Sequence, residues 1–316
     1  NMHYNTKEEV SKFYGPSNLF SGNKNIYYEY GWYNTKNKIA QLQNNIKIHS
    51  KNSIMKSDSL FYNNNNGYTK ALNNVILIDT IRDITIRGGI AENFEEDDRI
   101  IIKSKPLLEI NLEEDTLFMH AKEFIKEQNK NTIVAYPSVK FYEKKFQGKC
   151  DSLSYNIHDS TIRMFKKPIL WSENIQITAD SLELSIIKQE IKKIDSKGNP
   201  MIINKEDSIE YNQIRGKKII TSFKNNKLNK VNVLGNGESI FIVKDDINNT
   251  VGLNYIKSSN LYLYFKEGKI ENITYENKPN SIVIPTQEIN EKERYLDGFI
   301  WREHERPNNK EDIFNE

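Results

Sequence analysis

The chain has 316 residues, of which 37% are hydrophobic and 28% are charged, so its core is thin for its length. Lys and Arg number 45 against 43 Asp and Glu, a net charge of +2 that lacks the basic excess of a nucleic-acid-binding protein. One cysteine, Cys150, excludes an internal disulfide framework, and no apolar run approaches the about 18 residues that span a bilayer.

Strand-like segments begin near residue 23. The preceding residues, 1–22, read as a lead-in in which Thr6 to Tyr14 fits one short helical turn. The first predicted hairpin pairs Ile26–Tyr30 with Ile39–Ile48 across a polar turn. The 17 Tyr and 14 Phe residues of the chain also favour strands over helices.

A short motif, Asp and Ser before an apolar run, recurs along the chain. It occurs at Asp58, Asp151 and Asp180. The last two are 29 positions apart, and about three such steps separate the first two. A polar turn and a second apolar run follow each copy, as in Asn74–Leu77 after the first. A period of this size predicts a repeat architecture.

The repeat gives about eight units between residues 23 and 285. Leu117 to Gln128 fits either a helix or a strand, and the register of the repeat favours the strand. We predict a repeat domain over 23–285, with two sub-blocks meeting near residue 145 as an alternative division. The sequence turns polar over 286–316, which predicts a tail that is partly docked and, beyond about Arg302, solvated and mobile.

Several of these runs, repeated in one order, carry a resemblance. Each alone is a weak signal, an Asp or Asn before an apolar strand. Together they resemble the OstA-like (LptA-type) proteins of lipopolysaccharide transport, over roughly Asn23 to Tyr275. The runs are Ser57–Tyr62 with Asn74 and Val75, Ala121–Phe124 with Tyr136–Val139, and Pro168–Trp171 with Asn174–Leu182.

The resemblance implies an all-β fold, an elongated β-jellyroll (taco-like) stack of antiparallel β-hairpin repeats around an apolar trough. It implies a non-enzymatic protein that binds the lipid A part of lipopolysaccharide and bridges the periplasm of a Gram-negative cell towards the outer membrane, with membrane association left open. The implied partners are like-folded Lpt components at the inner and outer membranes. Unpaired end strands, expected near Tyr262 at one end, would also allow end-to-end self-association.

Aliphatic residues that alternate along the predicted strands are the candidates for the lipid trough. The ordinary alternative is a sandwich core, and a slip of one residue would turn the other face of a strand inward. The candidates are Ile46, Ile48, Val75, Leu77, Ile84, Ile86, Ile133, Ile162, Met164, Ile175 and Ile177.

Other clusters are weaker candidates for a site. Asp58, Asp151 and Asp180 would align along one edge of a stack, but Asp before Ser more often fixes strand entry through local backbone hydrogen bonds. The five histidines lack metal-binding spacing, Cys150 lacks a matching His motif, and no nucleotide-binding glycine loop occurs. We therefore predict no catalytic residue, no metal and no cofactor.

Two functions of other classes stay open at this point. One is a structural or adhesive β-solenoid with a dry core and no lipid cargo. The other is a carbohydrate-cleaving β-solenoid enzyme, which would need a carboxylate cluster outside the register of the repeat.

Overall fold

The computed structural model describes residues 1–22, 24–112, 115–127, 129–187, 190–224, 227–266, 269–277 and 279–315. Three residues that bound predicted segments lie outside these ranges: Asn23 begins the predicted repeat domain, Gln128 ends the predicted strand from Leu117, and Glu316 ends the predicted tail. The chain divides into unit 1, Asn1–Glu143 with Lys310–Glu316, and unit 2, Lys144–Asn309. Strands dominate both units and the described residues form no α-helix, which confirms the all-β prediction.

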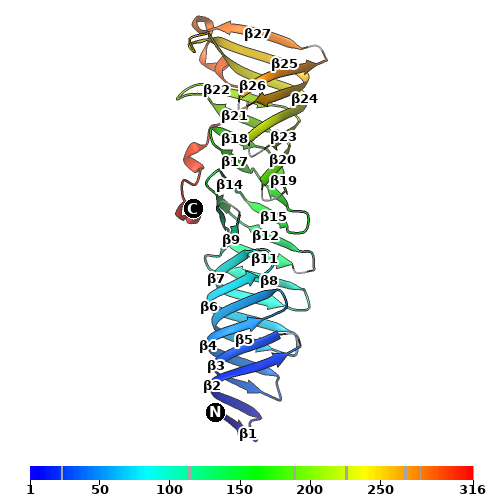
Figure 1. Cartoon of the computed structure of the whole chain (residues 1–316), viewed down its shortest axis with the longest axis vertical. Coiled ribbons are helices and arrows are strands. Elements are labelled where there is room, and N and C mark those ends of the chain that lie inside the picture. Colours follow the sequence, from blue (N-terminus) through cyan, green and yellow to red (C-terminus); the bar gives the residue numbers. More distant parts are fainter. Residues whose placement is uncertain are drawn as a thin grey trace. The chain divides into compact units, whose positions relative to one another are not determined.

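Unit 1 is a stack of antiparallel hairpins (Figure 1). The sequence suggested a helical turn over Thr6 to Tyr14, but residues 6–9 form the turn between β1 and β2 and residues 10–14 lie in β2, so that expectation is wrong. Half-buried and exposed residues alternate along β2, as in a strand covered on one face. The strands are β1 (Met2–Asn5), β2 (Val10–Ser21), β3 (Lys24–Asn34), β4 (Ile39–His49), β5 (Ser53–Asn63), β6 (Tyr68–Asp79), β7 (Ile84–Phe94), β8 (Arg99–Lys103), β9 (Leu107–Asn111), β10 (Thr116–His120), β11 (Glu123–Glu127), β12 (Thr132–Tyr136) and β13 (Val139–Tyr142).

Unit 2 repeats the arrangement with shorter and then longer strands. Four 3₁₀ helices lie in the C-terminal segment: η1 (Thr286–Glu288), η2 (Glu291–Arg294) and η3 (Glu303–Glu305) in unit 2, and η4 (Glu311–Phe314) in unit 1. The strands of unit 2 are β14 (Phe146–Cys150), β15 (Ser152–Asn156), β16 (Thr161–Phe165), β17 (Ile169–Ser172), β18 (Ile175–Thr178), β19 (Ser181–Ile187), β20 (Glu190–Lys197), β21 (Met201–Lys205), β22 (Tyr211–Arg215), β23 (Lys218–Lys224), β24 (Lys227–Lys244), β25 (Thr250–Lys266), β26 (Lys269–Glu276) and β27 (Asn280–Pro285).

Each unit has two layers of strands, because the chain bends as it passes from one layer to the other. In unit 1, layer A consists of β9, β10, β13 and the halves of β2–β7 that contain Leu19, Ile26, Ile48, Met55, Leu77 and Ile86. Layer B consists of β1, β8, β11, β12 and the other halves of β2–β7. In unit 2, layer A consists of β14, β17, β18, β21, β22, β27 and the adjoining parts of β24 and β25, and layer B of the remaining strands.

The bends use residues in the left-handed region. Asn44 and Asn45 have φ of 63° and 52°, and Asn73 and Asn74 have φ of 61° and 48°. The strand register shifts at the same positions. Asn adopts this region more readily than most residues, because its short side chain forms local hydrogen bonds. In later repeats a proline, as in Lys167–Pro168, accompanies the bend and splits the strand in two, since proline has no N–H to donate.

Apolar side chains fill the space between the layers of unit 1, and each of the strands β4–β7, which pass through both layers, contributes to both. Residues opposite each other on neighbouring strands share a face, so these side chains form continuous rows. The row in layer A is Ile26, Ile48, Met55, Leu77, Ile86, Leu108, Met119 and Phe141, all buried. The row in layer B is Leu42, Leu60, Ala71, Ala91, Ile102, Phe124 and Ala135, also all buried.

The interior of unit 2 is built in the same way, with a few hydroxyl groups among the apolar residues. Ser196 and Ser239 are fully buried, and their hydroxyl oxygens have no hydrogen-bond partner among the described residues. The row in layer A is Leu170, Ile177, Ile202, Ile214, Ser239 and Ile256. The row in layer B is Leu153, Met164, Leu182, Ser196, Ile219, Val233 and Leu261.

The C-terminal segment packs on the outside of layer A in unit 2, where Leu296 is buried against Met201, Ile203, Ile240 and Leu253. The last residues pack on unit 1, where Ile313 is 1% exposed. Beyond Arg302, Pro307 and Ile313 are buried and most of the other described residues are exposed, so this end is only partly solvated. The mobility expected for it stays a prediction. The boundaries 1–22, 23–285 and 286–316 stay predictions.

Tyr262 does not lie in an end strand. It faces Asn232 of β24 on one side and Thr274 of β26 on the other. The sequence placed the end of the stack one hairpin too early, because the short strands β26 and β27 both pair with β25. These two strands, in layers B and A, are the last in unit 2.

Candidate ligand-binding site

A pocket in unit 1 lies between the two layers. Ile26, Ile48, Met55 and Leu77 contribute its layer A wall. Its layer B wall is a second row, Tyr62, Thr69, Asn93 and Ile100, whose members face one another on β5, β6, β7 and β8. The cavity of about 70 Å³ has room for a few water molecules or a short alkyl segment. We call the side of unit 1 at which this pocket lies, away from the strand bends, the mouth.

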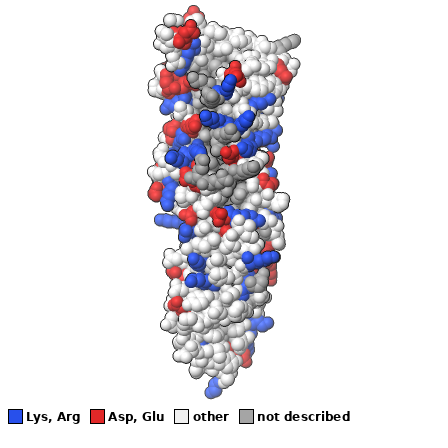
Figure 2. Space-filling view, viewed as in Figure 1, with Lys and Arg blue, Asp and Glu red and all other residues white. Residues whose placement is uncertain are grey.

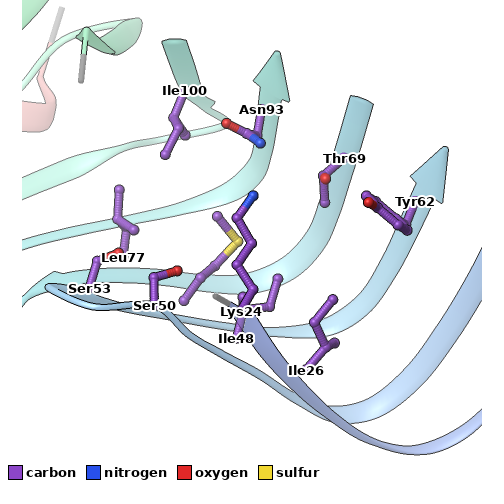
Figure 3. Close-up of a pocket in the computed structure, with 11 residues that line it drawn as sticks. Lys24, Ile26, Ile48, Ser50, Ser53, Tyr62, Thr69, Leu77, Asn93 and Ile100 are labelled. Carbon is purple, nitrogen blue, oxygen red and sulfur yellow. The ribbon is translucent and has the colours of Figure 1, made fainter. Parts of the chain in front are cut away.

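Polar residues surround the outer part of the pocket. Lys24 extends its side chain among the lining residues, and Ser50 and Ser53 stand beside it (Figure 3). Asn93 is 8% exposed, and its Oδ1 atom has no hydrogen-bond partner among the described residues. A buried acceptor without a donor costs free energy, so this position favours a ligand or water that can donate to it.

Two ion pairs join the layers across the mouth. Lys24, at the start of β3 in layer A, pairs with Glu95, which follows β7 in layer B. Asp79, at the end of β6 in layer A, pairs with Lys126 of β11 in layer B at 3.4 Å. Both side chains of the first pair are more than a third exposed, so this pair is weak. In the second pair, the Asp79 side chain is only 5% exposed.

The Asp79 carboxyl group is held ionised. Burial pushes its pKa up, but the backbone N–H of Ile81 and the charges of Lys126 and Arg82 outweigh burial, and the net pKa is lowered. Asp79 Oδ1 accepts from the N–H groups of Ile81 and Arg82 at 3.1 and 3.2 Å. The same carboxylate therefore fixes the turn after β6 and ties layer A to layer B.

The predicted trough residues are buried, except for Ile175, which is half-buried. The structure brings only Ile48 and Leu77 of the set into the pocket. Ile46, Val75, Ile84 and Ile86 lie elsewhere in layer A of unit 1, and Ile133 in its layer B. Ile162 and Met164 lie in layer B of unit 2, and Ile175 and Ile177 in its layer A. Whether these residues contact lipid stays a prediction.

The repeated aspartates lie at the bends, where they face polar residues of the neighbouring strand. Asp58 accepts from Asn74 at 2.8 Å, and Asp151 accepts from Lys166 at 2.8 Å. These side-chain bonds differ from the local backbone bonds that the sequence suggested, because the bend places a left-handed residue directly opposite each aspartate. They stabilise the bend and form no site for chemistry.

A row of buried glutamines on the outside of layer A in unit 2 was missed in the sequence. Gln213 Nε2 donates to Arg294 O at 2.7 Å, and its Oε1 accepts from Leu296 N at 2.8 Å. Gln176 makes the same two bonds, to Ile300 O and from Arg302 N, both at 2.8 Å. Each amide therefore holds the main chain of the C-terminal segment at two points.

Gln147 completes this row, and its Oε1 accepts from Arg306 Nε at 2.7 Å. A sequence signal existed, because Gln147 and Gln176 are 29 positions apart, the same spacing as Asp151 and Asp180. Without the structure, a glutamine between apolar residues reads as an ordinary surface position of a strand.

No cluster for metal or nucleophilic chemistry emerges from the described residues. They contain no group of three or more His, Cys, Asp or Glu side chains placed to hold a metal ion. Burial raises the pKa of Cys150 to about 12, and the nearby Asp151 charge adds to this, so the thiol stays protonated at neutral pH. On the face shown in Figure 2, positive and negative side chains are interspersed.

No helix within the described ranges is long and apolar enough to cross a membrane. No protein-family model matches the chain, and no curated protein matches it. Among solved structures, one similar chain is LptH of Pseudomonas aeruginosa, described as the LptA-homologous periplasmic component of the lipopolysaccharide transport device. The two are 10% identical, with a TM-score of 0.35 over 45% of this chain and 96% of that chain. A likeness of this size establishes neither family membership nor function.

Proposed function

We propose that the chain is a non-enzymatic carrier of lipopolysaccharide that holds the acyl chains of lipid A between its layers and bridges the periplasm towards the outer membrane. The repeated sequence runs that resemble the OstA-like proteins support this proposal, and so does the hairpin stack with an apolar interior. Under this proposal its partners are like-folded Lpt components at the two membranes, and copies of the chain can also stack end to end.

The observation that carries the proposal is the pair of apolar rows in each unit. Each row runs from strand to strand along its unit, so an acyl chain could lie along it without a closed pocket. The layers share strands at the bends, whereas in unit 1 side-chain ion pairs join them across the mouth. Side-chain pairs can exchange partners without breaking a strand ladder, so the mouth can widen while the bends hold.

The energetics suit reversible binding. Burial of one methylene group gains about 0.8 kcal/mol, whereas an exposed ion pair such as Lys24–Glu95 contributes about 0–1 kcal/mol. A few methylenes therefore offset the loss of that pair. The pair Asp79–Lys126 is more buried and costs more to separate, so opening is favoured on the Lys24 side of the mouth.

Photo-cross-linking tests the proposal with a matched inward and outward pair of sites on β5. Met55 is buried in the layer A row, and the next residue, Lys56, is exposed. A photoreactive amino acid at 55 is expected to capture lipopolysaccharide in Gram-negative cells, and the same group at 56 is not. Equal capture from both positions, or capture from neither, would count against a lipid-carrying interior.

A structural β-solenoid with a dry core is the second candidate. The observation in its favour is that the rows are packed, with Leu60, Ala71 and Ile102 fully buried, and that the pocket holds only about 70 Å³. Mass spectrometry of the protein purified from a Gram-negative host separates the two: a dry scaffold carries no stoichiometric lipid, whereas a carrier does.

A further inference from the structure

The pocket of unit 1 has three features that a packed core does not need. It holds a lysine with an exposed partner, a buried amide oxygen without a donor, and an apolar wall that continues into the rows between the layers. The lysine stands at the outer end and the apolar wall leads inward. This order, charge outside and hydrocarbon inside, matches the order of groups in an anionic amphiphile.

We propose that this pocket is the entry port for the alkyl chain of an anionic amphiphile, with Lys24 exchanging Glu95 for the anionic group of the ligand. The inference rests on the proposed function and adds the place and the charge of entry. Asn93 then accepts a hydrogen bond from a hydroxyl or amide N–H of the entering chain.

The exchange at Lys24 is feasible on the geometry of the pair. The side chains of Lys24 and Glu95 are 34% and 41% exposed, so water or a competing anion reaches both. The lysine stem lies beside Ile26 and Ile48, and its amino group can change partner without the stem leaving the pocket wall (Figure 3). Glu95 holds the port closed, because among the described residues it is the only charged partner of Lys24.

Asn93 gives the port a preference for chains that carry a donor. Its oxygen lies in the layer B wall, between Thr69 and Ile100 along the row. A plain hydrocarbon passing this point leaves the oxygen unpaired, whereas a hydroxyl or amide group satisfies it. The port therefore distinguishes a hydroxylated alkyl chain from an unsubstituted one.

Two substitutions with opposite expected signs test the charge exchange. Titration calorimetry of the full chain would use dodecyl phosphate and the uncharged dodecyl maltoside, each below its micelle concentration. Lys24→Met keeps the stem and removes the charge, so dodecyl phosphate should bind about tenfold more weakly while dodecyl maltoside stays within about twofold. Glu95→Gln frees Lys24 and should strengthen dodecyl phosphate binding by about twofold to fivefold.

Lys56→Met, an exposed lysine on β5 outside the pocket, is the matched control and should change neither affinity. Weakening of both probes by Lys24→Met, or weaker phosphate binding in Glu95→Gln, would overturn the exchange. Unchanged probe binding in both variants overturns the port as well. If these variants still cross-link lipopolysaccharide from position 55, only the port fails. If position 55 never captures lipid, the proposed function fails.

Asn93→Leu tests the donor preference. It removes the unpaired oxygen, so the melting temperature should rise or stay level, and folding is not compromised. Binding of 3-hydroxydodecanoate should weaken by about fivefold relative to dodecanoate. An equal change in the affinities for 3-hydroxydodecanoate and dodecanoate would show that Asn93 affects the shape of the wall but does not accept a hydrogen bond from the ligand.

Discussion

At the scale of single residues, the interior depends on a few polar groups whose pairing is specific. Asp79 joins the turn after β6 to Lys126 in the other layer. Its folded-state pKa is lowered, so its contribution to stability is fully present above the pKa of about 3.8 that it has when unfolded. That contribution is lost as the pH falls through the lower folded value.

We expect Asp79→Asn to lower the stability of unit 1 by about 1–3 kcal/mol at pH 7, because it removes the charged partner of Lys126. Urea unfolding followed by circular dichroism measures this. The difference between the variant and the natural chain should shrink progressively as the pH falls below 3.8, where the unfolded state protonates, and should vanish once the pH is below the lower folded-state pKa of Asp79. A difference that is the same at pH 3 and pH 7 would show that the carboxylate charge does not matter.

The bends show how far single residues could be predicted from the sequence. The pairs Asn44–Asn45 and Asn73–Asn74, at the period of 29, mark the bends, and a left-handed backbone is what Asn supplies most readily among non-glycine residues. The pocket could not be predicted in this way. Lys24 and Glu95 are 71 positions apart, and only the stacking of three hairpins brings them together.

At the scale of elements, the C-terminal segment behaves as a third layer that is held by its main chain. Its backbone groups meet Gln213 at Arg294 and Leu296, and Gln176 six residues later at Ile300 and Arg302. The two glutamines are two strands apart, about 9.6 Å at ordinary strand spacing. The segment covers that distance with six residues, so it is compact, in keeping with the turn in which Phe299 N–H donates to Leu296 O at 3.0 Å.

We expect Gln176→Ala to release this segment locally, because the substitution removes both hydrogen bonds to the segment, together with a longer one from Trp171 Nε1 at 3.3 Å, and leaves two main-chain groups unpaired, a loss of about 1–3 kcal/mol. Limited proteolysis should then cut near residues 300–302 several times faster than in the natural chain. Gln43→Ala, at an exposed glutamine of β4, serves as control and should leave the rate unchanged. Equal cutting rates in the two variants would mean that apolar packing of Leu296 alone holds the segment.

The contacts by which this segment docks could not be predicted from the sequence, for a physical reason. Composition averages over a stretch, and residues 286–316 are mostly polar. Their position is decided by a few buried side chains, such as Leu296 and Ile313, and by main-chain hydrogen bonds. Main-chain groups are the same for almost every residue type, so these hydrogen bonds leave no signal in the sequence. The repeat strands, in contrast, show their buried face in the alternation of every second residue.

At the scale of the whole molecule, association with another chain depends on strand edges that are left unpaired among the described residues. In unit 2, β26 and β27 each pair with β25 on one side only. On β27, Ile282 and Val283 are 51% and 60% exposed, whereas soluble proteins usually protect such strands with charge or proline. Exposed sheet edges are a general means by which one chain pairs with a strand of another, so β27 is the candidate edge for the proposed end-to-end association.

We therefore expect Val283→Lys to weaken end-to-end association of the full chain, because a charged residue on an edge strand must be desolvated when another strand pairs with it. Light scattering after size-exclusion chromatography, over a range of concentrations, measures the shift towards monomer. Ile247→Lys is the control, since Ile247 is also highly exposed, at 80%, but lies in the turn between β24 and β25 and not on β27. The fold should be unaffected in both variants, because neither side chain is buried. If Ile247→Lys dissociates the chain as strongly as Val283→Lys, association depends on general surface hydrophobicity. If only Val283→Lys does so, β27 is the edge through which the stack extends.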